Sequence, residues 1–214
     1  MTPSAPPPPS RLLRRRIVGG VAATLALPVF IRHALAQAAL RPTPAQTEGP
    51  YYPVKLPDDT DFDLLAQGKL RYTRGAATWL EGTVTDTNGR PLRGAVVEIW
   101  QCDEQGHYHH PGDGGAADPA FQGFGRVAAG NDGSYRFRTI RPAPYTGRTP
   151  HIHVKVRLAQ RELLTTQLYV ESDPGNARDF LWRRLSAEDR AAVTVPFAPV
   201  ADGLRARFGI VVVA

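Results

Sequence analysis

The feature that most constrains the fold is a series of short segments in which apolar and polar residues alternate. Residues 78–86 alternate in this way and run into a turn that contains Asn88-Gly89, and Asn131-Asp132-Gly133 leads into a similar segment at 134–140. Successive side chains of a strand point to opposite faces, and Asn-Gly turns are typical of hairpins. The pattern therefore predicts an all-β protein.

Four more strands are expected at 94–101, 151–158, 163–170 and 205–213. The middle two should form a hairpin around Ala159-Gln160-Arg161. One helix is expected around 177–185, followed by a second short helical turn capped at Ser186. Short strands at this spacing indicate a β-sandwich of two mostly antiparallel sheets with one or two short helices.

Residues 1–36 have the pattern of an export signal. Arg14, Arg15 and Arg16 precede an apolar run at 17–31, and Ala34-Leu35-Ala36 supplies small residues at the cleavage spacing. The run is shorter than the roughly 20 residues of a membrane span. Consecutive arginines favour the twin-arginine route, so we expect export to the periplasm with no membrane span after cleavage. An ordinary secretory signal and an uncleaved membrane anchor are the alternatives.

Residues 37–75 are rich in Pro, Gly and Asp and predict an extended N-terminal arm, whereas 76–214 carry the strands of one β-sandwich domain. The net charge is +6, of which the leader contributes +5, so the rest carries +1. A basic surface for nucleic acid is therefore not expected. The single cysteine, Cys102, excludes an intramolecular disulfide and a cysteine-based zinc site.

Two histidines and two tyrosines form a candidate metal-binding set. His151 and His153 are two residues apart on an expected strand, so both imidazoles lie on one face. Tyr145 lies just before this strand. Tyr108 stands between two further histidines, and in an extended segment either the tyrosine or its neighbours face the site.

Phenols favour ferric iron over zinc. A free phenol has a pKa near 10, and a bound cation can deprotonate such a ligand. Zinc prefers three histidines, or two with a carboxylate, and the ferrous triad also requires a carboxylate. A divalent-metal hydrolase that uses His107, His109, His151 and His153 is one alternative, and a β-sandwich binding module without a metal is another.

Seven segments together resemble the intradiol ring-cleavage dioxygenases, particularly the catalytic (beta) subunit of protocatechuate 3,4-dioxygenase. The similarity spans about 45–172, and the ordered set is highly specific although no single segment is. The segments are Thr-Glu-Gly-Pro-Tyr-Tyr-Pro at 47–53, Val-Glu-Ile-Trp-Gln at 97–101, and the runs 106–108, 121–126, 132–140, 145–153 and 166–169.

The resemblance implies a non-haem Fe(III) cofactor. Tyr108 and His151 would be its equatorial ligands, and Tyr145 and His153 its axial ligands. It also implies the reaction: O₂ cleaves a catechol-type ring between the two hydroxyl-bearing carbons, and the product is of the cis,cis-muconate type.

Further site residues follow from the same resemblance. Arg148 matches the family's active-site arginine and Gln167 a glutamine beside it, while Tyr51 and Tyr52 of the 47–53 segment would bind substrate together with Arg148. The run 145–151 is shorter than in well-known members and has Thr146 where protocatechuate enzymes carry tryptophan. The ring substituent therefore stays open. The sequence does not indicate the oligomeric state or a partner subunit.

Overall fold

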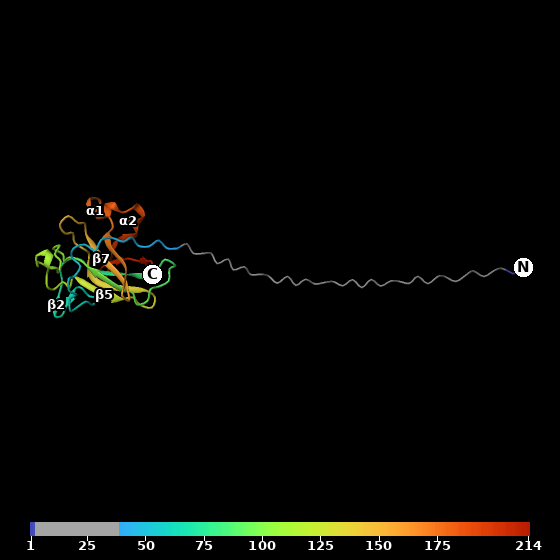
Figure 1. Ribbon diagram of the computed structural model, residues 1–214, viewed down its shortest axis with the longest axis horizontal. Coiled ribbons are helices and arrows are strands. Elements are labelled where there is room, and N and C mark those ends of the chain that lie inside the picture. Colours follow the sequence, from blue (N-terminus) through green and yellow to red (C-terminus); the bar gives the residue numbers. More distant parts are fainter. Residues whose placement is uncertain (3–38) are drawn as a thin grey trace. The chain divides into compact units, whose positions relative to one another are not determined.

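The computed structural model describes residues 1–2 and 39–214, so the expected export signal lies outside the described part of the chain (Figure 1). The regular structure of the described chain consists mainly of short strands joined by turns. The strands are β1 (Ala66–Gln67), β2 (Leu70–Arg71), β3 (Ala77–Asp86), β4 (Val96–Trp100), β5 (Phe124–Ala128), β6 (Ser134–Ile140), β7 (His151–Leu158), β8 (Arg161–Val170), β9 (Thr194–Val195), β10 (Phe197–Val200), β11 (Gly203–Arg207) and β12 (Ile210–Val212). The helices are α1 (Phe180–Arg184) and α2 (Ala187–Val193), with 3-10 turns at Pro111–Asp113 and Asn176–Arg178.

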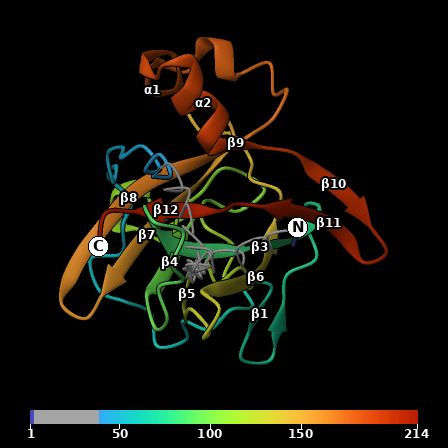
Figure 2. The same ribbon diagram turned by 90° about the vertical axis from the view of Figure 1, so that its right-hand side faces the viewer.

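Two sheets form the sandwich. One has the order β10-β11-β3-β12, with β6 also paired to β3, and the other has the order β5-β4-β7-β8-β9. Most pairs are antiparallel, but β11 and β12 run parallel to β3, and β9 runs parallel to β8. The two helices lie together beside β9 (Figure 2). The predicted all-β sandwich with short helices is confirmed.

The core lies between the sheets, where Leu80 and Phe137 of one sheet join Ile99, Ile152 and Val154 of the other. Strand β7 is buried on both of its faces. Its even-numbered residues point into this core, whereas His151, His153 and Lys155 point to the outer face and are also buried. The outer face of β7 is therefore covered by other parts of the chain, which is the setting that a buried polar site needs.

Part of that cover comes from residues 39–75. The backbone N–H of Thr43 donates to the carbonyl of Val211, and that of Gln46 donates to Thr165 on β8. Farther on, Tyr51 and Tyr52 pack against a second apolar cluster that contains Trp100 and Tyr108. In residues 39–214 no helix combines the length and apolarity needed to cross a bilayer.

The prediction of one continuous C-terminal strand at 205–213 is wrong, because this segment forms two strands, β11 and β12. The carbonyl of Phe208 accepts the hydroxyl of Tyr135 at 2.6 Å, and the N–H of Phe208 donates to Glu81. A Cβ built on Gly82 would lie 1.8 Å from the Phe208 carbonyl oxygen. The chain therefore crosses Gly82 closely at this point, and the strand is interrupted there.

The helix expected at 177–185 is also divided. Asp179 has extended backbone angles (φ −72°, ψ 124°) and separates a 3-10 turn from α1. Its side chain accepts hydrogen bonds from the N–H groups of Leu181 and Trp182, so it is the N-cap of α1 and not a residue within the helix. The predicted cap at Ser186 is confirmed, since its hydroxyl accepts from Asp189 at the start of α2.

Candidate metal centre

His151 and His153 lie side by side on β7, and both are almost fully buried. Their Nε2 atoms are 3.2 Å apart. His151 Nδ1 is 2.7 Å from the carbonyl oxygen of Thr149, and a carbonyl only accepts, so Nδ1 carries the proton. The lone pair of His151 is therefore on Nε2, which points at its neighbour, as a metal ligand requires.

Tyr145 reaches this site from a tight turn. Residues 145–148 close the turn through a hydrogen bond from Arg148 N to Tyr145 O of 2.9 Å. Gly147 has φ +77° at the third position, which suits a type II turn and favours glycine. The ring of Tyr145 lies 5.3 Å from that of His151 and 5.3 Å from that of Tyr108. The turn thus brings Tyr145 and Arg148 to the end of β7.

Tyr108 enters from the long loop between β4 and β5. The Asp113 carboxylate accepts the N–H of Tyr108 at 2.8 Å and fixes the loop. A Cβ on Gly106 (φ +86°) would lie 2.9 Å from the Pro144 carbonyl oxygen, so glycine permits this loop to approach the Tyr145 turn. Tyr108 is 2% exposed, and its ring centroid lies 6.1 Å from that of His153.

The structure separates Tyr108 from its neighbouring histidines. His107 lies beside Asp113, with 3.3 Å between Nδ1 and the carboxylate, and His109 Nε2 contacts the carbonyl of Phe121. Within residues 39–214, no three His, Cys, Asp or Glu side chains gather as a metal-binding group. The alternative site of His107, His109, His151 and His153 is therefore not assembled. Two imidazoles and two phenols are brought together instead.

The protonation states of these groups fit a metal site. Burial, and then the Arg148 charge, lowers the pKa of His151 to about 3. Burial, and then His151, lowers the pKa of His153 well below its usual value. Burial raises the pKa of both Tyr108 and Tyr145, although Arg148 opposes the rise at Tyr145. Both imidazoles are therefore neutral at pH 7, and the phenols need a cation to become phenolates.

A free donor atom supports the same conclusion. The hydroxyl oxygen of Tyr108 is buried and has no hydrogen-bond partner among the described residues. Buried polar atoms usually have a partner, and one without deserves an explanation. A metal ion held by Tyr108, Tyr145 and the two imidazoles would provide it. The donor set is the one that suits a hard trivalent cation, because phenolates supply anionic oxygen ligands.

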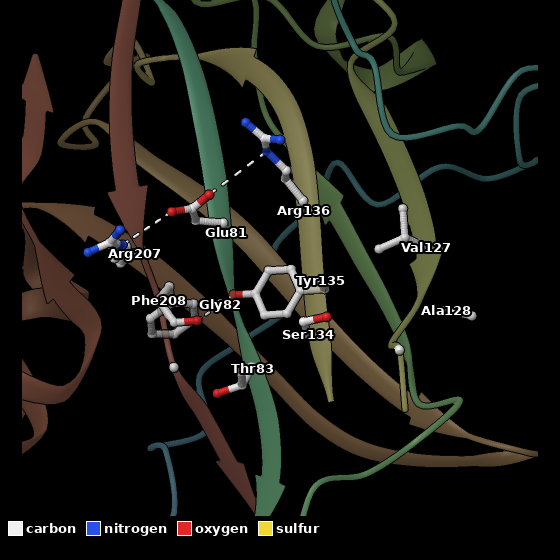
Figure 3. A pocket seen from close by; sticks show the side chains of 12 residues that line it. Glu81, Gly82, Thr83, Val127, Ala128, Ser134, Tyr135, Arg136, Arg207 and Phe208 are labelled. Atoms are coloured by element: carbon white, nitrogen blue, oxygen red, sulfur yellow. Dashed lines mark hydrogen bonds and ion pairs between the residues drawn. The ribbon is translucent and has the colours of Figure 1, made fainter. Parts of the chain in front are cut away.

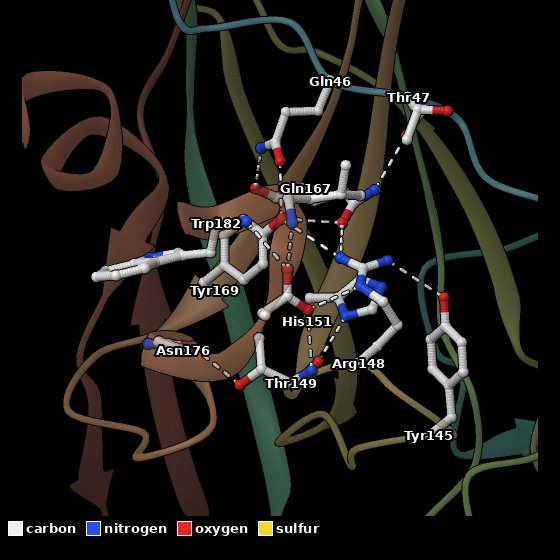
Figure 4. A network of polar contacts seen from close by, with 12 residues as sticks. Gln46, Thr47, Tyr145, Arg148, Thr149, His151, Gln167, Tyr169, Asn176 and Trp182 are labelled. Atoms are coloured by element: carbon white, nitrogen blue, oxygen red, sulfur yellow. Dashed lines mark hydrogen bonds and ion pairs between the residues drawn. The ribbon is translucent and has the colours of Figure 1, made fainter. Parts of the chain in front are cut away.

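Arg148 lies at the centre of a polar network beside His151 (Figure 4). Its Nη2 donates to Gln167 Oε1 at 2.5 Å, and its Nη1 donates to the Tyr145 hydroxyl at 3.3 Å. Gln167 is fully buried and also donates to the Thr47 carbonyl at 3.0 Å. The predicted pair of Arg148 and Gln167 thus lies together, and Arg148 contacts a predicted metal ligand.

Tyr51 and Tyr52 have different surroundings. The ring of Tyr51 stacks on Tyr108 with centroids 4.6 Å apart and lies 5.7 Å from the ring of Tyr145. Tyr51 also borders two cavities, of about 130 Å³ and 530 Å³, which Tyr108 and Tyr145 line respectively. The Tyr52 hydroxyl instead donates to the buried Glu98 at 2.8 Å, and its ring lies against Trp100. Tyr51 adjoins the site directly, whereas Tyr52 packs behind it.

A larger cavity of about 730 Å³ lies elsewhere, on the sheet that contains β3 and β6 (Figure 3). Glu81 lines it and pairs with Arg207 at 3.1 Å and with Arg136 at 3.8 Å. Its lining includes none of the four phenol and imidazole residues. Cavity size alone therefore does not mark the site of this protein, and the convergence of buried donor atoms does.

Several residues of the site were not anticipated from the sequence. Trp100 stacks on His153, Tyr169 donates its hydroxyl to Gln46, and Asp179 accepts a hydrogen bond from Arg148. The role of Asp179 as a helix cap could have been predicted, because an aspartate just before a helical segment is a typical N-cap. Its contact with Arg148, 31 residues away, has no counterpart in the local sequence.

The fold and this site define an all-β protein with a mixed tyrosine and histidine centre. A sequence profile of the family described as "Dioxygenase" matches residues 47–197. The chain belongs to this family. The relatives that it resembles are intradiol ring-cleavage dioxygenases.

Two curated relatives illustrate the similarity. A hydroxyquinol 1,2-dioxygenase of Corynebacterium glutamicum is 34% identical over 153 residues, which cover 62% of this chain and 47% of that protein. A protocatechuate 3,4-dioxygenase beta chain of Burkholderia cepacia is 38% identical over 110 residues, 46% of each chain. The chain thus spans about half the length of the curated relatives that it matches.

A solved structure covers more of the chain. The dioxygenase domain of a dioxygenase and carbohydrate-binding protein fusion from Streptomyces sp. SirexAA-E is 33% identical. Its TM-score is 0.66, and the match covers 81% of this chain and 100% of that domain. The predicted membership of the intradiol family is therefore confirmed.

Proposed function

We propose that the protein is a non-haem Fe(III)-dependent intradiol dioxygenase. It would cleave a catechol-type ring with O₂ between the two hydroxyl-bearing carbons and give a cis,cis-muconate-type product. The observation that carries this proposal is the convergence of two neutral imidazoles and two phenols, within residues that match the dioxygenase family. The match supports the reaction class and leaves the ring substituent open.

Tyr108, Tyr145, His151 and His153 would hold the iron. Bound Fe(III) would supply Lewis-acid chemistry to both oxygens of a catechol. The chain supplies two anionic and two neutral ligands, a set that offsets most of a trivalent charge in a buried site. The carboxylate ligand that a ferrous triad requires is not among them, which supports the ferric over the ferrous form.

The two phenols differ in their surroundings, and this difference supports different roles. Tyr108 is buried and held by its loop, whereas Tyr145 is only half-buried and accepts a hydrogen bond from Arg148. Tyr145 is thus the residue that would take a substrate proton at its phenolate oxygen. Arg148 would remain beside it and fix the position of its oxygen through the hydrogen bond from Nη1.

Arg148 would also stabilise the negative charge that develops on the ring during the reaction. A fixed cation in a water-poor site is effective in this role because it needs no reorganisation when the charge appears. Gln167 would hold the guanidinium in place through its side-chain oxygen. Tyr51 borders the cavities next to both phenols, so we propose it as a contact of the aromatic substrate.

The leader supports a further part of the proposal, which is export of the protein to the periplasm. Its consecutive arginines favour the twin-arginine route. This route carries folded proteins, so a metal could be inserted before export. Fractionation of cells that produce the full chain, with and without an Arg14→Lys and Arg15→Lys double substitution, would test the route.

One measurement separates the proposed function from its alternatives. Iron-loaded protein should be burgundy, because tyrosinate-to-ferric charge transfer absorbs visible light, and it should consume O₂ when a catechol is added. Product analysis over a panel of substituted catechols would then identify the substrate. A colourless zinc protein, or a protein that binds neither metal nor catechol, would contradict the proposal.

A further inference from the structure

Asp179 is a buried carboxylate that lies against Arg148. It is 1% exposed and accepts four hydrogen bonds. Its Oδ2 accepts from Arg148 Nε at 2.7 Å and from the backbone N–H of Thr149 at 3.1 Å. Its Oδ1 accepts from the backbone N–H groups of Leu181 at 2.9 Å and Trp182 at 3.0 Å. One oxygen thus caps α1, while the other holds Arg148 and the backbone of Thr149.

The Oδ2 side reaches the histidines as well as the arginine. Thr149, whose N–H donates to Asp179, accepts the Nδ1 proton of His151 at its own carbonyl. Asp179 therefore fixes both the guanidinium and the residue that orients a proposed metal ligand. Outer groups of this kind are known to tune metal sites through the orientation of the ligands.

The three nitrogens of Arg148 each have a partner. Nε donates to Asp179, Nη1 to Tyr145 and Nη2 to Gln167. Of these partners, Asp179 is the carboxylate, and hydrogen bonds between ionised groups are about twice as strong as neutral ones. Burial raises the pKa of Asp179, but hydrogen bonds from Arg148, Trp182 and Thr149 outweigh burial and hold it below the usual value. The pair is ionised at neutral pH.

We propose that Asp179 is a positioning residue, which orients the Arg148 guanidinium toward the metal centre and balances its charge. This inference rests on the proposed function. The four hydrogen bonds that Asp179 accepts all come from the protein, and one of them comes from Arg148. It acts on the reaction through Arg148 and not through the helix that it caps.

The competing explanation is that Asp179 is only the N-cap of α1. A cap alone contributes about 1 kcal/mol to stability and has no reason to contact Arg148. The variants Asp179→Asn and Asp179→Ser separate the two roles, since both keep a side-chain oxygen for the cap and remove the negative charge. The matched control is Ser186→Ala, which removes the cap of the neighbouring helix α2 and contacts no residue of the site.

In iron-loaded protein, Asp179→Asn should lower kcat/KM for a catechol about 10- to 100-fold, the usual effect of an outer residue of a metal site. Arg148→Met should lower it at least as much. The loss in the double variant Asp179→Asn/Arg148→Met should be smaller than the product of the two single losses, because residues that act through one another are not additive. Ser186→Ala should lower stability but leave kcat/KM within about twofold, since a lost cap changes the free energy of unfolding alone.

A measurement on metal-free protein supplies a readout other than activity. Each single variant leaves a buried charge without its partner, whereas the double variant removes both charges. The urea midpoint of the double variant should therefore fall by less than the sum of the two single shifts. If Asp179→Asn does not fold, Asp179→Ser serves in the same cycle.

Two results would overturn the inference: effects of the two substitutions that multiply in kcat/KM, or midpoint shifts that simply add. A loss of kcat/KM in Ser186→Ala equal to that in Asp179→Asn would also assign the effect to the helix. Failure of the wild-type protein to consume O₂ with any catechol is a different outcome. It would overturn the proposed function and the catalytic role of Asp179 with it, while the urea cycle would still report whether the pair is coupled.

Discussion

Trp100 lies flat against His153, with ring centroids 4.8 Å apart and ring planes 8° from parallel. The two residues are directly opposite each other on the neighbouring strands β4 and β7. Tyr52 also meets Trp100 edge to face, with ring centroids 5.0 Å apart. The imidazole of His153 is thus held against the buried ring of Trp100, which limits the directions in which its lone pair can point.

Replacement of Trp100 should weaken metal binding. Trp100→Leu should lower the free energy of unfolding by about 2–4 kcal/mol, because it removes a large buried ring. It should also lower iron affinity about tenfold, since His153 loses its orientation. Phe137→Leu, in the sandwich core, is the control for lost packing and should keep wild-type iron affinity. Urea unfolding and iron titration measure both effects, and equal affinities of Trp100→Leu and wild type would refute the role.

Removal of one imidazole should abolish iron binding. The two Nε2 atoms are 3.2 Å apart, so His153→Ala removes a donor that other residues cannot replace. Iron content after reconstitution and desalting should be close to background. His109→Ala is the control, because His109 contacts the backbone carbonyl of Phe121 instead, and it should bind iron normally. Full iron occupancy in His153→Ala would remove His153 from the ligand set.

Tyr145 should be required for turnover more than for iron. Tyr145→Phe keeps the adjacent pair of imidazoles and the buried phenol of Tyr108, so it should retain iron. Its kcat should fall about 10²- to 10⁴-fold, the range expected for loss of an acid–base group. Tyr72→Phe, whose hydroxyl contacts the backbone of Glu104 away from the site, is the matched control. Iron assays and O₂ uptake measure the two quantities. Unchanged turnover in Tyr145→Phe would contradict the assignment of Tyr145 as the proton-accepting ligand.

The turn at Gly147 offers a clean test of backbone geometry. Gly147 and Gly94 have φ of +77° and +73°, and a Cβ on either would meet no heavy atom within 4 Å. Alanine at each position should therefore cost a similar 1–2 kcal/mol, roughly the penalty of a left-handed conformation. Only Gly147→Ala should also lower kcat, because the turn carries both Tyr145 and Arg148. Equal kcat values in the two variants would show that the turn geometry is not important for the reaction.

Much of the site was predictable because its spacing is local. The alternation in β7 places His151 and His153 on one face, and the proximity of Tyr145 and Arg148 to that strand is visible in the chain itself. The alternation did not decide whether Tyr108 or its two histidine neighbours face the site. In the structure Tyr108 lies near His153, and the neighbouring histidines do not.

The rest depends on contacts between distant segments. The stacking of Tyr51 on Tyr108 and of Trp100 on His153 follows from the path of the chain over β7, which no local pattern encodes. Strand β5 was not predicted, and it contains Gly125, a residue that normally weakens a strand. A Cβ there would lie 2.6 Å from Leu64, so glycine is needed for close approach of the preceding segment. The tertiary packing overrides the local preference.

Lys155 links β7 to Glu48 in residues 39–75, and it gives the stability of the fold a pH dependence. It is 4% exposed, contacts the carboxylates of Glu48 and Glu162, and lies 4.3 Å above the ring of Tyr52. Burial lowers the pKa of Lys155, but the two carboxylates outweigh burial and raise it above the usual value of 10.5. The folded protein thus holds this proton more tightly than the unfolded chain does.

A raised pKa means that the contribution of Lys155 to stability is fully present below pH 10.5 and is lost as the pH rises through the folded pKa. Lys155→Met keeps most of the buried volume and removes the charge. The difference in free energy of unfolding between wild type and Lys155→Met should therefore be constant from about pH 7 to 9 and shift in favour of the variant above about pH 10. Lys69→Met, on the exposed turn between β1 and β2, should follow the wild type throughout. Urea unfolding at each pH measures this difference, and a Lys155→Met curve parallel to the wild type up to pH 12 would show that the buried contacts do not hold the proton.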